Sequence, residues 1–585
     1  MRSQPRKTKI VCTIGPTSEE PEVIRKLIQS GMNVARLNFS HGDHDSHKAK
    51  AELIKRIAEE ENRAIALLMD TMGPEIRLGA FPDGPVELEQ GAEVRICHED
   101  VEGNEQQFSV TYKEIDHDVV PGARILIDDG LVELEVQKKD GRDLLCTVLN
   151  SGEVSSHKSI NLPGTDVSLP SMTEQDMADI AFGVENDFDF IAASFVRRSE
   201  DVMNIRRLLD KLGGSDIMII AKIENRQGVS NFEEILDASD GIMVARGDLG
   251  VEIPAFEVPT VQKRLISRCY QKGKPCITAT QMLDSMIRHP RPTRAEASDV
   301  ANAILDGTSA IMLSGETANG LYPIEAVLMM DKIARFTETN YDYWSDFSHG
   351  LHGEVHGVSA AVSHAACMTA MDVKAKAIVA VTHSGRTARQ MSRFRPACPI
   401  IATTVSPRTR RQLALSWGVT PFLSSELHST DQLFEAGLET ALNSGIVDNG
   451  DLVVLSAGTP VGMSGTTNTM KVANVGQIIV HGTGLNGSMT RPITGDAFVI
   501  TDLTELPPTF SHKTAIIVTR DTNNSMISLL RQALAIVVEN PDPNSHAVTV
   551  AETLDIPIIY GAENCTRLVS NGQTITVDAQ AGMVS

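Results

Sequence analysis

Short runs of apolar residues, each ending in a polar or charged residue, recur through the first half of the chain. Eight of them have the length and the β-branched content of a buried parallel strand, namely residues 9–13, 33–38, 64–70, 188–194, 216–222, 240–246, 275–280 and 309–314. Amphipathic stretches separate most of these runs; residues 20–30, for example, place Val23, Leu27 and Ile28 on one helical face. Eight strands alternating with helices predict a (β/α)8 TIM barrel, whose active site lies at the carboxyl ends of the strands.

One connection breaks this alternation. Residues 72–168 hold short strand-like runs, such as 93–96 and 124–127, that are punctuated by Gly and Pro. A separate all-β domain explains such a stretch better than a long loop does. We therefore expect a barrel built from residues 1–71 and 169–343, with an inserted β-barrel cap between the two parts.

The pattern starts again after the predicted barrel. Residues 344–475 read as a second α/β domain, with helices near 360–371 and 431–443 and strands at 377–381 and 400–404. Residues 480–585 contain further strands at 515–518, 556–560 and 574–577. These segments predict two more domains of α/β class.

Composition narrows the class of protein. The chain has 585 residues, with 76 acidic and 53 basic side chains and a formal net charge of −23. Such a charge argues against a nucleic-acid or anionic-lipid partner. The eight cysteines form no Cys-x-x-Cys pair, and no apolar run approaches the length of a membrane span. We expect a cytoplasmic protein with reduced thiols, no membrane segment and no bound nucleic acid.

The chemistry-bearing side chains cluster at the predicted strand ends. Lys222 and Glu224 lie two residues apart in an extended segment, so their side chains point the same way. Asp248 follows the next strand, and two carboxylates can share Mg²⁺ or Mn²⁺. A lysine beside the metal can stabilise charge on a phosphoryl group or an enolate. The alternative is a buried ion pair that only lines the barrel.

Three histidines, His41, His44 and His47, are spaced three residues apart. This spacing allows a zinc site, but no further soft ligand is near them in the sequence. The simpler interpretation is a solvated helix start with one histidine that faces a ligand.

Several long motifs stand in a fixed order along the chain. They are 9–16 (KIVCTIGP), 35–42 (ARLNFSHG), 217–229 (IMIIAKIENRQGV), 245–254 (ARGDLGVEIP), 278–286 (TATQMLDSM), 292–303 (PTRAEASDVANA) and 311–318 (IMLSGETA). Together these motifs resemble the pyruvate kinase family over nearly the whole chain, and the segment 217–229 is similar to the family's active-site signature.

The resemblance implies phosphoryl transfer from phosphoenolpyruvate to ADP, which gives pyruvate and ATP as the last step of glycolysis. Glu224 and Asp248 would hold Mg²⁺ or Mn²⁺, and Lys222 would stabilise the transferring phosphoryl group and the enolate. Arg36 would bind the phosphate through its planar fork, and Thr280 would lie near the face where the enolate is protonated. The substrate-binding set implied by the resemblance is Arg36, Lys222, Gly247, Asp248 and Thr280.

Two further sites follow from the same resemblance. A potassium site would use the oxygen ligands of Asn38, Ser40, Asp70 and Thr71, although helix capping also explains Asn38 and Ser40. The nucleotide-binding residues would be Asn38, Phe39, Ser40, His41, Arg77 and Lys158. The resemblance also implies a homotetramer.

The chain departs from the family pattern at two positions. The family usually has Lys at position 72, where this chain has Met72, and Gly is more common at the position of Ser159. The first change removes a cation but leaves Lys222 and both metal ligands in place. Neither change argues for an inactive enzyme.

The turn after the strand at 377–381 is similar to the family's effector-phosphate loop. It contains Thr382, Ser384, Gly385, Arg386 and Thr387 in front of a predicted helix, which is a favourable place for a phosphate. A sugar-phosphate or AMP effector would fit, whereas the alternative is a capped helix without a ligand. Arg408, Arg410 and Arg411 either add charge there or form a solvated basic turn.

The last domain resembles the swivelling phosphohistidine domain of phosphoenolpyruvate-utilising enzymes, as in bacterial pyruvate kinases with an extra C-terminal domain. The family's Gly-Gly-x-Thr before the histidine is replaced here by Pro541-Asp542-Pro543-Asn544, so we favour a stabilising appendage over a phosphoryl carrier at His546.

Two other functions compete with the leading hypothesis. One is a metal-dependent pyruvate or enolate aldolase or lyase on a similar barrel, and the other is a non-catalytic phosphoenolpyruvate sensor. The cap domain and Arg77 count against the aldolase, which needs no ADP. The presence of Lys222, Glu224, Asp248 and Thr280 counts against the sensor.

Overall fold

The computed structural model describes residues 5–350, 353–425, 429–459, 467–476, 479–485, 491–501 and 515–585. Two compact units make up the chain. One contains Ala365–Val381 and Ser424–Ser585, and the other contains Pro5–His364 and Thr382–Leu423. Among the described residues, none of the helices combines the length and the apolar character that crossing a membrane requires.

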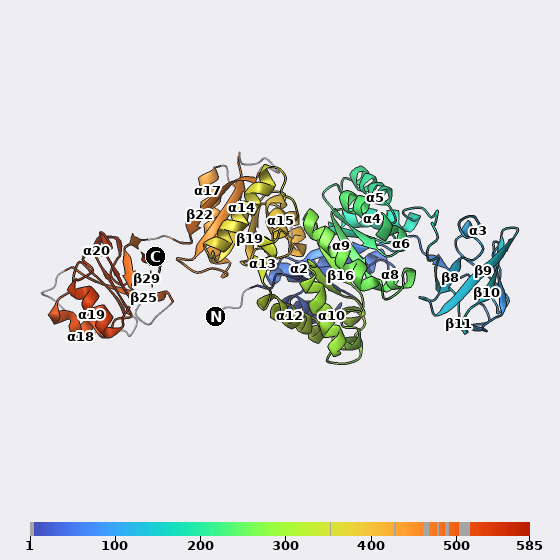
Figure 1. Ribbon diagram of the computed structural model, residues 1–585, viewed down its shortest axis with the longest axis horizontal. Coiled ribbons are helices and arrows are strands. Elements are labelled where there is room, and N and C mark those ends of the chain that lie inside the picture. Colours follow the sequence, from blue (N-terminus) through green and yellow to red (C-terminus); the bar gives the residue numbers. More distant parts are fainter. Residues whose placement is uncertain are drawn as a thin grey trace. The chain divides into compact units, whose positions relative to one another are not determined.

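Eight parallel strands close into a barrel in the order β1-β17-β16-β15-β14-β13-β3-β2 (Figure 1). They are β1 (Lys9–Thr13), β2 (Val34–Asn38), β3 (Ala66–Asp70), β13 (Phe190–Ala193), β14 (Met218–Ile223), β15 (Gly241–Ala245), β16 (Cys276–Ala279) and β17 (Ala310–Leu313). Each predicted apolar run overlaps one of these strands to within two residues at either end. The predicted barrel is therefore confirmed.

Two apolar layers hold the barrel together. The inner layer includes Val34, Leu68, Phe190 and Ile277, all at most 1% exposed, and Leu415 packs with them. The outer layer lies between the strands and the surrounding helices, where residues such as Leu27 and Ile54 are buried. Side chains that alternate between these layers explain why the strand sequences are apolar throughout.

Helices surround the barrel strands, and the helix predicted at residues 20–30 is among them. The main ones are α1 (Pro21–Ser30), α2 (His44–Glu60), α4 (Glu174–Glu185), α5 (Ser199–Leu212), α7 (Phe232–Ala238), α9 (Val258–Lys272), α10 (Arg294–Leu305) and α12 (Pro323–Thr339). Shorter ones are α6 (Arg226–Ser230), α8 (Arg246–Glu252), η1 (Asp284–Ile287) and α11 (Gly315–Ala318). Thr293 and Glu296 form a capping box at the start of α10, and Gly31, with φ of +118°, ends α1.

The inserted cap is all-β apart from one helical turn, α3 (Ile115–Asp118). Its main sheet has the order β4-β12-β8-β9-β10-β6-β7, and β11 pairs with β5. The strands are β4 (Ile76–Arg77), β5 (Val86–Leu88), β6 (Glu93–Cys97), β7 (Gln107–Ser109), β8 (Arg124–Ile127), β9 (Val132–Asp140), β10 (Asp143–Val148), β11 (Gly152–Val154) and β12 (Ser159–Asn161). Strand β10 alternates buried and half-buried residues, which gives the cap its own core.

The α/β pattern returns after α13 (Tyr343–Ser348) and α14 (Val358–Asp372). In one unit, β18 (Ala377–Val381) pairs in parallel with β21 (Leu452–Gly458), which pairs antiparallel with β22 (Thr467–Asn474). In the other, β19 (Ile400–Thr404) pairs in parallel with β20 (Val419–Leu423). The helices of this stretch are α15 (Arg386–Arg393), α16 (Pro407–Gln412), η2 (Leu413–Leu415) and α17 (Thr430–Asn443).

The C-terminal segment forms an eight-stranded sheet in the order β23-β30-β29-β25-β26-β27-β28-β24. Its strands are β23 (Val480–His481), β24 (Thr483–Leu485), β25 (Ile493–Ile500), β26 (Ala515–Thr519), β27 (Ala535–Val538), β28 (Ile558–Tyr560), β29 (Thr574–Asp578) and β30 (Met583–Val584). The helices are η3 (Asn524–Met526), α18 (Ile527–Leu530), α19 (His546–Leu554) and α20 (Cys565–Leu568). Two apolar clusters cover this sheet, so the segment has a core of its own.

Candidate active site

The carboxyl ends of β2 and β3 bring Arg36 and Asp70 together. Arg36 Nε donates to Asp70 Oδ2 at 2.5 Å, and Arg36 Nη1 donates to Thr13 Oγ1 at 2.9 Å. In the register of the two strands, Asn38 lies beside Asp70. The Arg36 guanidinium is thereby held in one orientation at the end of the barrel.

Lys222, on β14, is the second cation of this cluster. Its Nζ lies 2.8 Å from Glu224 Oε1 and 3.1 Å from Asp70 Oδ1, and it donates to Ser194 Oγ at 2.7 Å. The geometry agrees with the alternation that placed Lys222 and Glu224 on one side. Burial alone would lower the pKa of Lys222, but Asp70 and Glu224 outweigh it and raise that pKa above its ordinary value. Lys222 is therefore a fixed positive charge at neutral pH.

Asp70 lies between the two cations and is itself fully buried. Burial would raise the pKa of Asp70, but Arg36 and Lys222 hold that pKa below its usual value. Asp70 therefore remains a carboxylate. Its ion pairs with Arg36 and Lys222 connect the ends of β2, β3 and β14.

Glu224 and Asp248 form the carboxylate side of the cluster. Glu224 Oε2 accepts the N–H of Phe195 at 2.6 Å. Burial raises the pKa of Glu224 to about 7; Lys222 opposes this rise and Asp248 adds to it. Within the described part of the chain, Asp248 has no ion-pair partner. A divalent cation would relieve the repulsion between these two carboxylates, so the donor set fits Mg²⁺ or Mn²⁺.

Thr280 and Gly247 meet at the ends of β16 and β15. Thr280 Oγ1 accepts the N–H of Gly247 at 2.7 Å, and the Thr280 backbone has a φ of +66°, a left-handed conformation that is unusual for a β-branched residue. Arg246 Nη2 donates to the Thr280 carbonyl at 2.7 Å and supports this turn. The two residues are thus in contact, as a shared substrate-binding role requires.

The predicted potassium ligands lie on adjoining segments. Asn38 and Asp70 are register neighbours, and the N–H of Ser40 donates to Asn38 Oδ1 at 3.3 Å. Thr71 Oγ1 donates to the Ala192 carbonyl at 3.3 Å. The set offers carbonyl-type, hydroxyl and carboxylate oxygens, which suit a monovalent cation, but Asp70 is also paired with Arg36 and Lys222.

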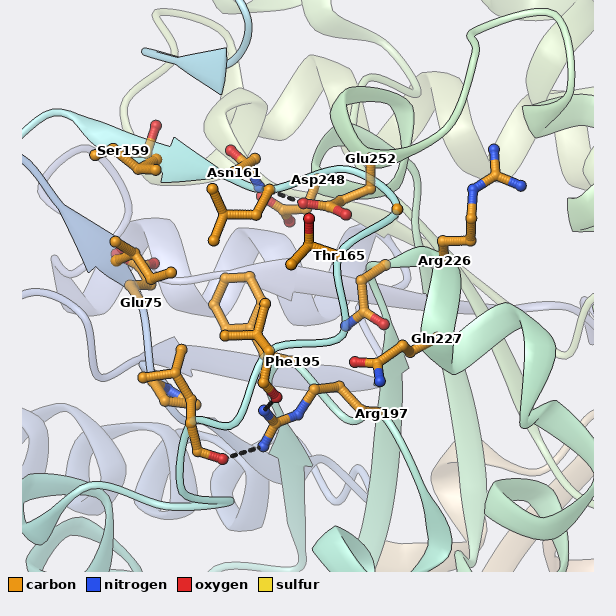
Figure 2. Close-up of a pocket in the computed structure, with 18 of the residues that line it drawn as sticks. Glu75, Ser159, Asn161, Thr165, Phe195, Arg197, Arg226, Gln227, Asp248 and Glu252 are labelled. Atoms are coloured by element: carbon orange, nitrogen blue, oxygen red, sulfur yellow. Dashed lines mark hydrogen bonds between the residues drawn. The ribbon is translucent and has the colours of Figure 1, made fainter. Parts of the chain in front are cut away.

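A cavity of about 630 Å³ lies between the barrel and the cap, and Asp248 is part of its wall (Figure 2). The cap contributes Arg77 and Lys158, two of the predicted nucleotide contacts. Arg77 pairs with Glu75, and its Nη1 donates to the His157 carbonyl at 2.9 Å. Lys158 Nζ lies 2.8 Å from Asp128 Oδ2. The cavity is large enough for a small anionic ligand and presents cations from the cap to it.

Sequence reasoning gave no role to Ser194, Phe195 or Arg197, although all three contact the site or its cavity. It also missed Glu252, whose Oε1 accepts from Asn161 Nδ2 of the cap at 3.1 Å. The only signal was position, because residues 194–197 follow the fourth apolar run just as Asp248 follows the sixth.

The histidine segment differs from the predicted solvated helix start. His47 is 4% exposed and stacks on Phe39 with ring centroids 4.0 Å apart, and its Nε2 contacts the His41 carbonyl at 2.9 Å. His44 Nε2 lies 2.7 Å from Asp179 Oδ1. The prediction was wrong for His47 because the aromatic ring of Phe39 provides an apolar surface that the charged segment does not reveal.

The effector-like loop begins directly after β18. Gly385 has a φ of +78° and precedes α15, and Thr387 is buried in the first turn of that helix. Arg389 Nη2 donates to the Ser384 carbonyl at 2.6 Å, which fixes the loop from inside the helix. The start of α15 therefore lies among the residues of the predicted loop, which are Thr382, Ser384, Gly385, Arg386 and Thr387.

The three arginines near position 410 were expected either to add charge at this loop or to be solvated. Two of them are instead ion-paired with barrel residues. Arg411 Nε lies 2.9 Å from Asp189 Oδ1, and Arg408 Nη2 lies 2.5 Å from Asp187 Oδ1. The prediction was wrong for this pair because their partners lie about 220 residues earlier in the chain.

His546 is the first residue of α19. Its Nδ1 lies 2.8 Å from Thr522 Oγ1 and its Nε2 lies 3.0 Å from Asn524 Oδ1. Both ring nitrogens thus have hydrogen-bond partners, and the role of a stabilising appendage stays a prediction.

The fold and the site together define a class of protein. An eight-stranded parallel barrel carries, at its carboxyl ends, a lysine, an arginine and a carboxylate pair that suits a divalent cation, with a cation-bearing cap across a cavity. These are the parts of a metal-assisted phosphotransferase that acts on anionic substrates.

Comparisons with known proteins identify the family. Residues 5–327 match "Pyruvate kinase, barrel domain", residues 360–473 match "Pyruvate kinase, alpha/beta domain" and residues 511–582 match "PEP-utilising enzyme, mobile domain". The chain belongs to the pyruvate kinase family.

Relatives named pyruvate kinase cover the chain almost completely. The one from Sporosarcina psychrophila is 49% identical over 582 residues, which is 99% of this chain and 98% of that protein. The one from Geobacillus stearothermophilus is 47% identical over 581 residues, with the same shares. A crystal structure of a pyruvate kinase from Cryptosporidium parvum aligns with a TM-score of 0.77 at 40% identity, covering 80% of this chain and 96% of that one. The fold class, the phosphotransferase class and the family resemblance are all confirmed.

Proposed function

We propose that the chain transfers the phosphoryl group of phosphoenolpyruvate to ADP, giving pyruvate and ATP. The main support is the position of the Lys222 ammonium group, which is fixed between Asp70 and Glu224 and lies beside Asp248. A buried cation of this kind stabilises the charge that develops as the phosphoryl group leaves an enolate.

The other residues take roles that follow from their positions. Arg36, oriented by Asp70 and Thr13, binds the phosphate of phosphoenolpyruvate. Gly247 and Thr280 bind near its carboxylate and reacting carbon, and Arg77 and Lys158 of the cap bind the nucleotide with Asn38, Phe39, Ser40 and His41.

Metal ions complete the proposed site. Glu224 and Asp248 would hold Mg²⁺ or Mn²⁺, which would supply charge neutralisation to the phosphoryl group. Asn38, Ser40, Asp70 and Thr71 would hold K⁺. The support for both sites is their oxygen-only donor sets. At Glu224 and Asp248 the two carboxylates also outnumber the one neighbouring lysine, Lys222.

A coupled assay with lactate dehydrogenase tests the activity. We expect pyruvate formation from phosphoenolpyruvate and ADP that needs both Mg²⁺ and K⁺. An enzyme that forms no pyruvate under these conditions would overturn the proposal and favour the sensor, whereas release of pyruvate from an aldol substrate without ADP would favour the aldolase.

We also propose that the loop of Thr382, Ser384, Gly385, Arg386 and Thr387 binds the phosphate of a sugar-phosphate or AMP effector. The support is the polar turn in front of α15 and its fixation by Arg389. Adding ribose 5-phosphate, AMP and fructose 1,6-bisphosphate one at a time to the coupled assay checks this proposal, because one of them should lower the KM for phosphoenolpyruvate.

Assembly, location and domain limits also remain our proposals. A homotetramer is supported by exposed apolar side chains such as Phe256, Leu321 and Phe336, each more than 70% exposed, and sedimentation would measure its mass. A cytoplasmic location is supported by the eight buried cysteines, which form no disulfide in the part of the chain that the structure describes. The proposed domains are residues 1–71 with 169–343, 72–168, 344–475 and 480–585.

A further inference from the structure

The four residues that follow β13, residues 194–197, contact the site from one side; we call them the strand-end segment. Ser194 Oγ accepts a hydrogen bond from Lys222 Nζ at 2.7 Å, and the N–H of Phe195 donates to Glu224 Oε2 at 2.6 Å. Phe195 has a φ of +55°, an unusual value for a bulky residue. The strand-end segment thus positions both the cation and one carboxylate of the site.

The same segment contacts the chain where it leaves the barrel for the cap, at residues 71–75. Ser194 Oγ donates to the Thr71 carbonyl at 2.6 Å. Gly73 has a φ of +75°, and a Cβ there would lie 2.9 Å from Phe195 Cδ2 and from Ser194 Cβ. This close approach requires glycine, so the outgoing hinge packs directly on the strand-end segment.

Arg197 holds the chain where it returns from the cap, at residues 167–170. Its Nη1 donates to the Val167 carbonyl at 2.7 Å, and its Nη2 donates to the carbonyls of Leu169 and Pro170 at 2.6 and 3.3 Å. The planar guanidinium thus bridges three backbone carbonyls of the return hinge in a way that one point donor could not. Figure 2 shows Arg197 below Phe195 in the wall of the cavity.

The Arg197 side chain is buried, so its hydrogen bonds to the return hinge, which we call the hinge clamp, are not surface contacts. Its side chain is 8% exposed, and Asp201 Oδ2 lies 3.6 Å from Nε and balances its charge. The Arg197 carbonyl also accepts from Asn231 Nδ2 at 2.9 Å. A buried guanidinium whose donors serve backbone carbonyls is expected to fix geometry rather than to bind a ligand.

We propose that Arg197 is a positioning residue that ties the return hinge of the cap to the strand-end segment, so that the orientation of the cap is coupled to Lys222 and Glu224. The cap contains Arg77 and Lys158, whereas the barrel contains the phosphoenolpyruvate side of the site. Release of the hinge should therefore impair the binding of ADP more than the binding of phosphoenolpyruvate. The kinetic part of this proposal and the response to ligands rest on the proposed function, whereas the width of the distance distribution in the ligand-free chain does not.

A distance measurement tests the positional part without any turnover. All eight native cysteines are buried, so spin labels at Lys138→Cys in the cap and Lys48→Cys on the barrel can be attached selectively. In the otherwise native chain, we expect the label-to-label distance distribution to narrow when Mg²⁺ and phosphoenolpyruvate are added, because the site and the hinge share one segment.

Arg197→Gln removes the charge and the fork, and Arg197→Lys keeps the charge alone. We expect Arg197→Gln to give a broader distance distribution that no longer responds to Mg²⁺ and phosphoenolpyruvate, with Arg197→Lys in between. The matched control is Arg198→Gln, because Arg198 is 61% exposed and, among the residues that the structure describes, its side chain makes a single ion-pair contact, at 3.8 Å with Asp201. The control should behave like the native chain.

Kinetics separate positioning from a merely structural role. We expect the KM for ADP to rise about tenfold in Arg197→Gln while the KM for phosphoenolpyruvate changes less than twofold. A structural role would lower kcat through loss of active enzyme and leave the KM for ADP unchanged. If Arg197→Gln fails to fold, Arg197→Lys supplies both readouts. Distance distributions in the Arg197 variants that match those of Arg198→Gln would overturn the proposal, even if the enzyme proved to have another activity.

Discussion

Replacing Lys222 with Met tests the electrostatic design of the site. The Nζ atom of Lys222 lies 2.8 Å from Glu224 Oε1 and 3.1 Å from Asp70 Oδ1. At an effective dielectric constant of about 20, each contact corresponds to about 5 to 6 kcal/mol of Coulomb attraction, which is largely offset by desolvation of the ions. Removal of one partner leaves two buried carboxylates, so we expect a loss of about 3–5 kcal/mol of unfolding free energy in the metal-free protein.

The catalytic effect of Lys222→Met should exceed its effect on binding. In the proposed reaction Lys222 acts on charge that develops as the phosphoryl group transfers. We therefore expect kcat to fall by about 10³- to 10⁴-fold, or about 4–5.5 kcal/mol, with modest changes in KM. The coupled pyruvate assay measures kcat, and urea unfolding with and without Mg²⁺ measures stability. A divalent cation at the proposed site of Glu224 and Asp248 would replace part of the lost positive charge, so Mg²⁺ should restore part of the stability but not the activity.

The control for this variant is Lys48→Met, which removes an exposed lysine from α2 and should change neither quantity. A near-normal kcat in Lys222→Met would refute the assigned role of the lysine. Unchanged metal-free stability would refute the view that its ion pairs hold the two carboxylates in place.

Three further changes probe other parts of the molecule. Arg77→Met should raise the KM for ADP about tenfold in the coupled assay and leave the KM for phosphoenolpyruvate nearly constant. The opposite pattern would contradict the proposed role of Arg77 in nucleotide binding. Arg411→Met leaves the buried Asp189 without its cation, so urea unfolding should show a loss of about 3–5 kcal/mol at pH 8. Since burial raises the pKa of Asp189 to about 6, protonation should make this loss smaller at pH 5, and an equal loss at both pH values would contradict the explanation. Burial lowers the pKa of Lys9 to about 7 from an ordinary value near 10.5, so the unfolded chain binds more protons between these pH values and native stability rises with pH. Relative to Lys9→Met, the native chain should therefore gain about 2 kcal/mol in urea unfolding between pH 7 and 9, and a constant difference would contradict the lowered pKa.

The sequence predicts the barrel and the central pair of the site for the same physical reason. Parallel strands buried on both faces produce continuous apolar runs, which mark the eight strands to within two residues. Alternation within an extended strand then places Lys222 beside Glu224. Both inferences use only neighbours along the chain, and both are confirmed.

The features that the sequence does not predict depend on partners distant in the chain. Arg411 pairs with Asp189, which is 222 residues away in the chain. The hinge clamp of Arg197 uses backbone carbonyls of residues 167–170, and backbone carbonyls leave no signal in the sequence. His47 is buried because Phe39 stacks on it, a contact that the surrounding charged residues conceal. In each case the residue type is ordinary, and only the tertiary structure gives it a role.

The charge balance of the site is negative, as is the net charge of −23 of the whole chain. The core cluster contains two cationic side chains, Arg36 and Lys222, and three carboxylates, Asp70, Glu224 and Asp248. Burial raises the pKa of Glu224 to about 7, so these charges leave one negative charge in excess once Glu224 is ionised. Both Arg77 and Lys158 of the cap are also paired with carboxylates. Such a site repels phosphoenolpyruvate and ADP until further positive charge arrives. A divalent and a monovalent cation would turn the excess into two positive charges, so the proposed need for both ions follows from the protein's own charge balance and from the anionic substrates together.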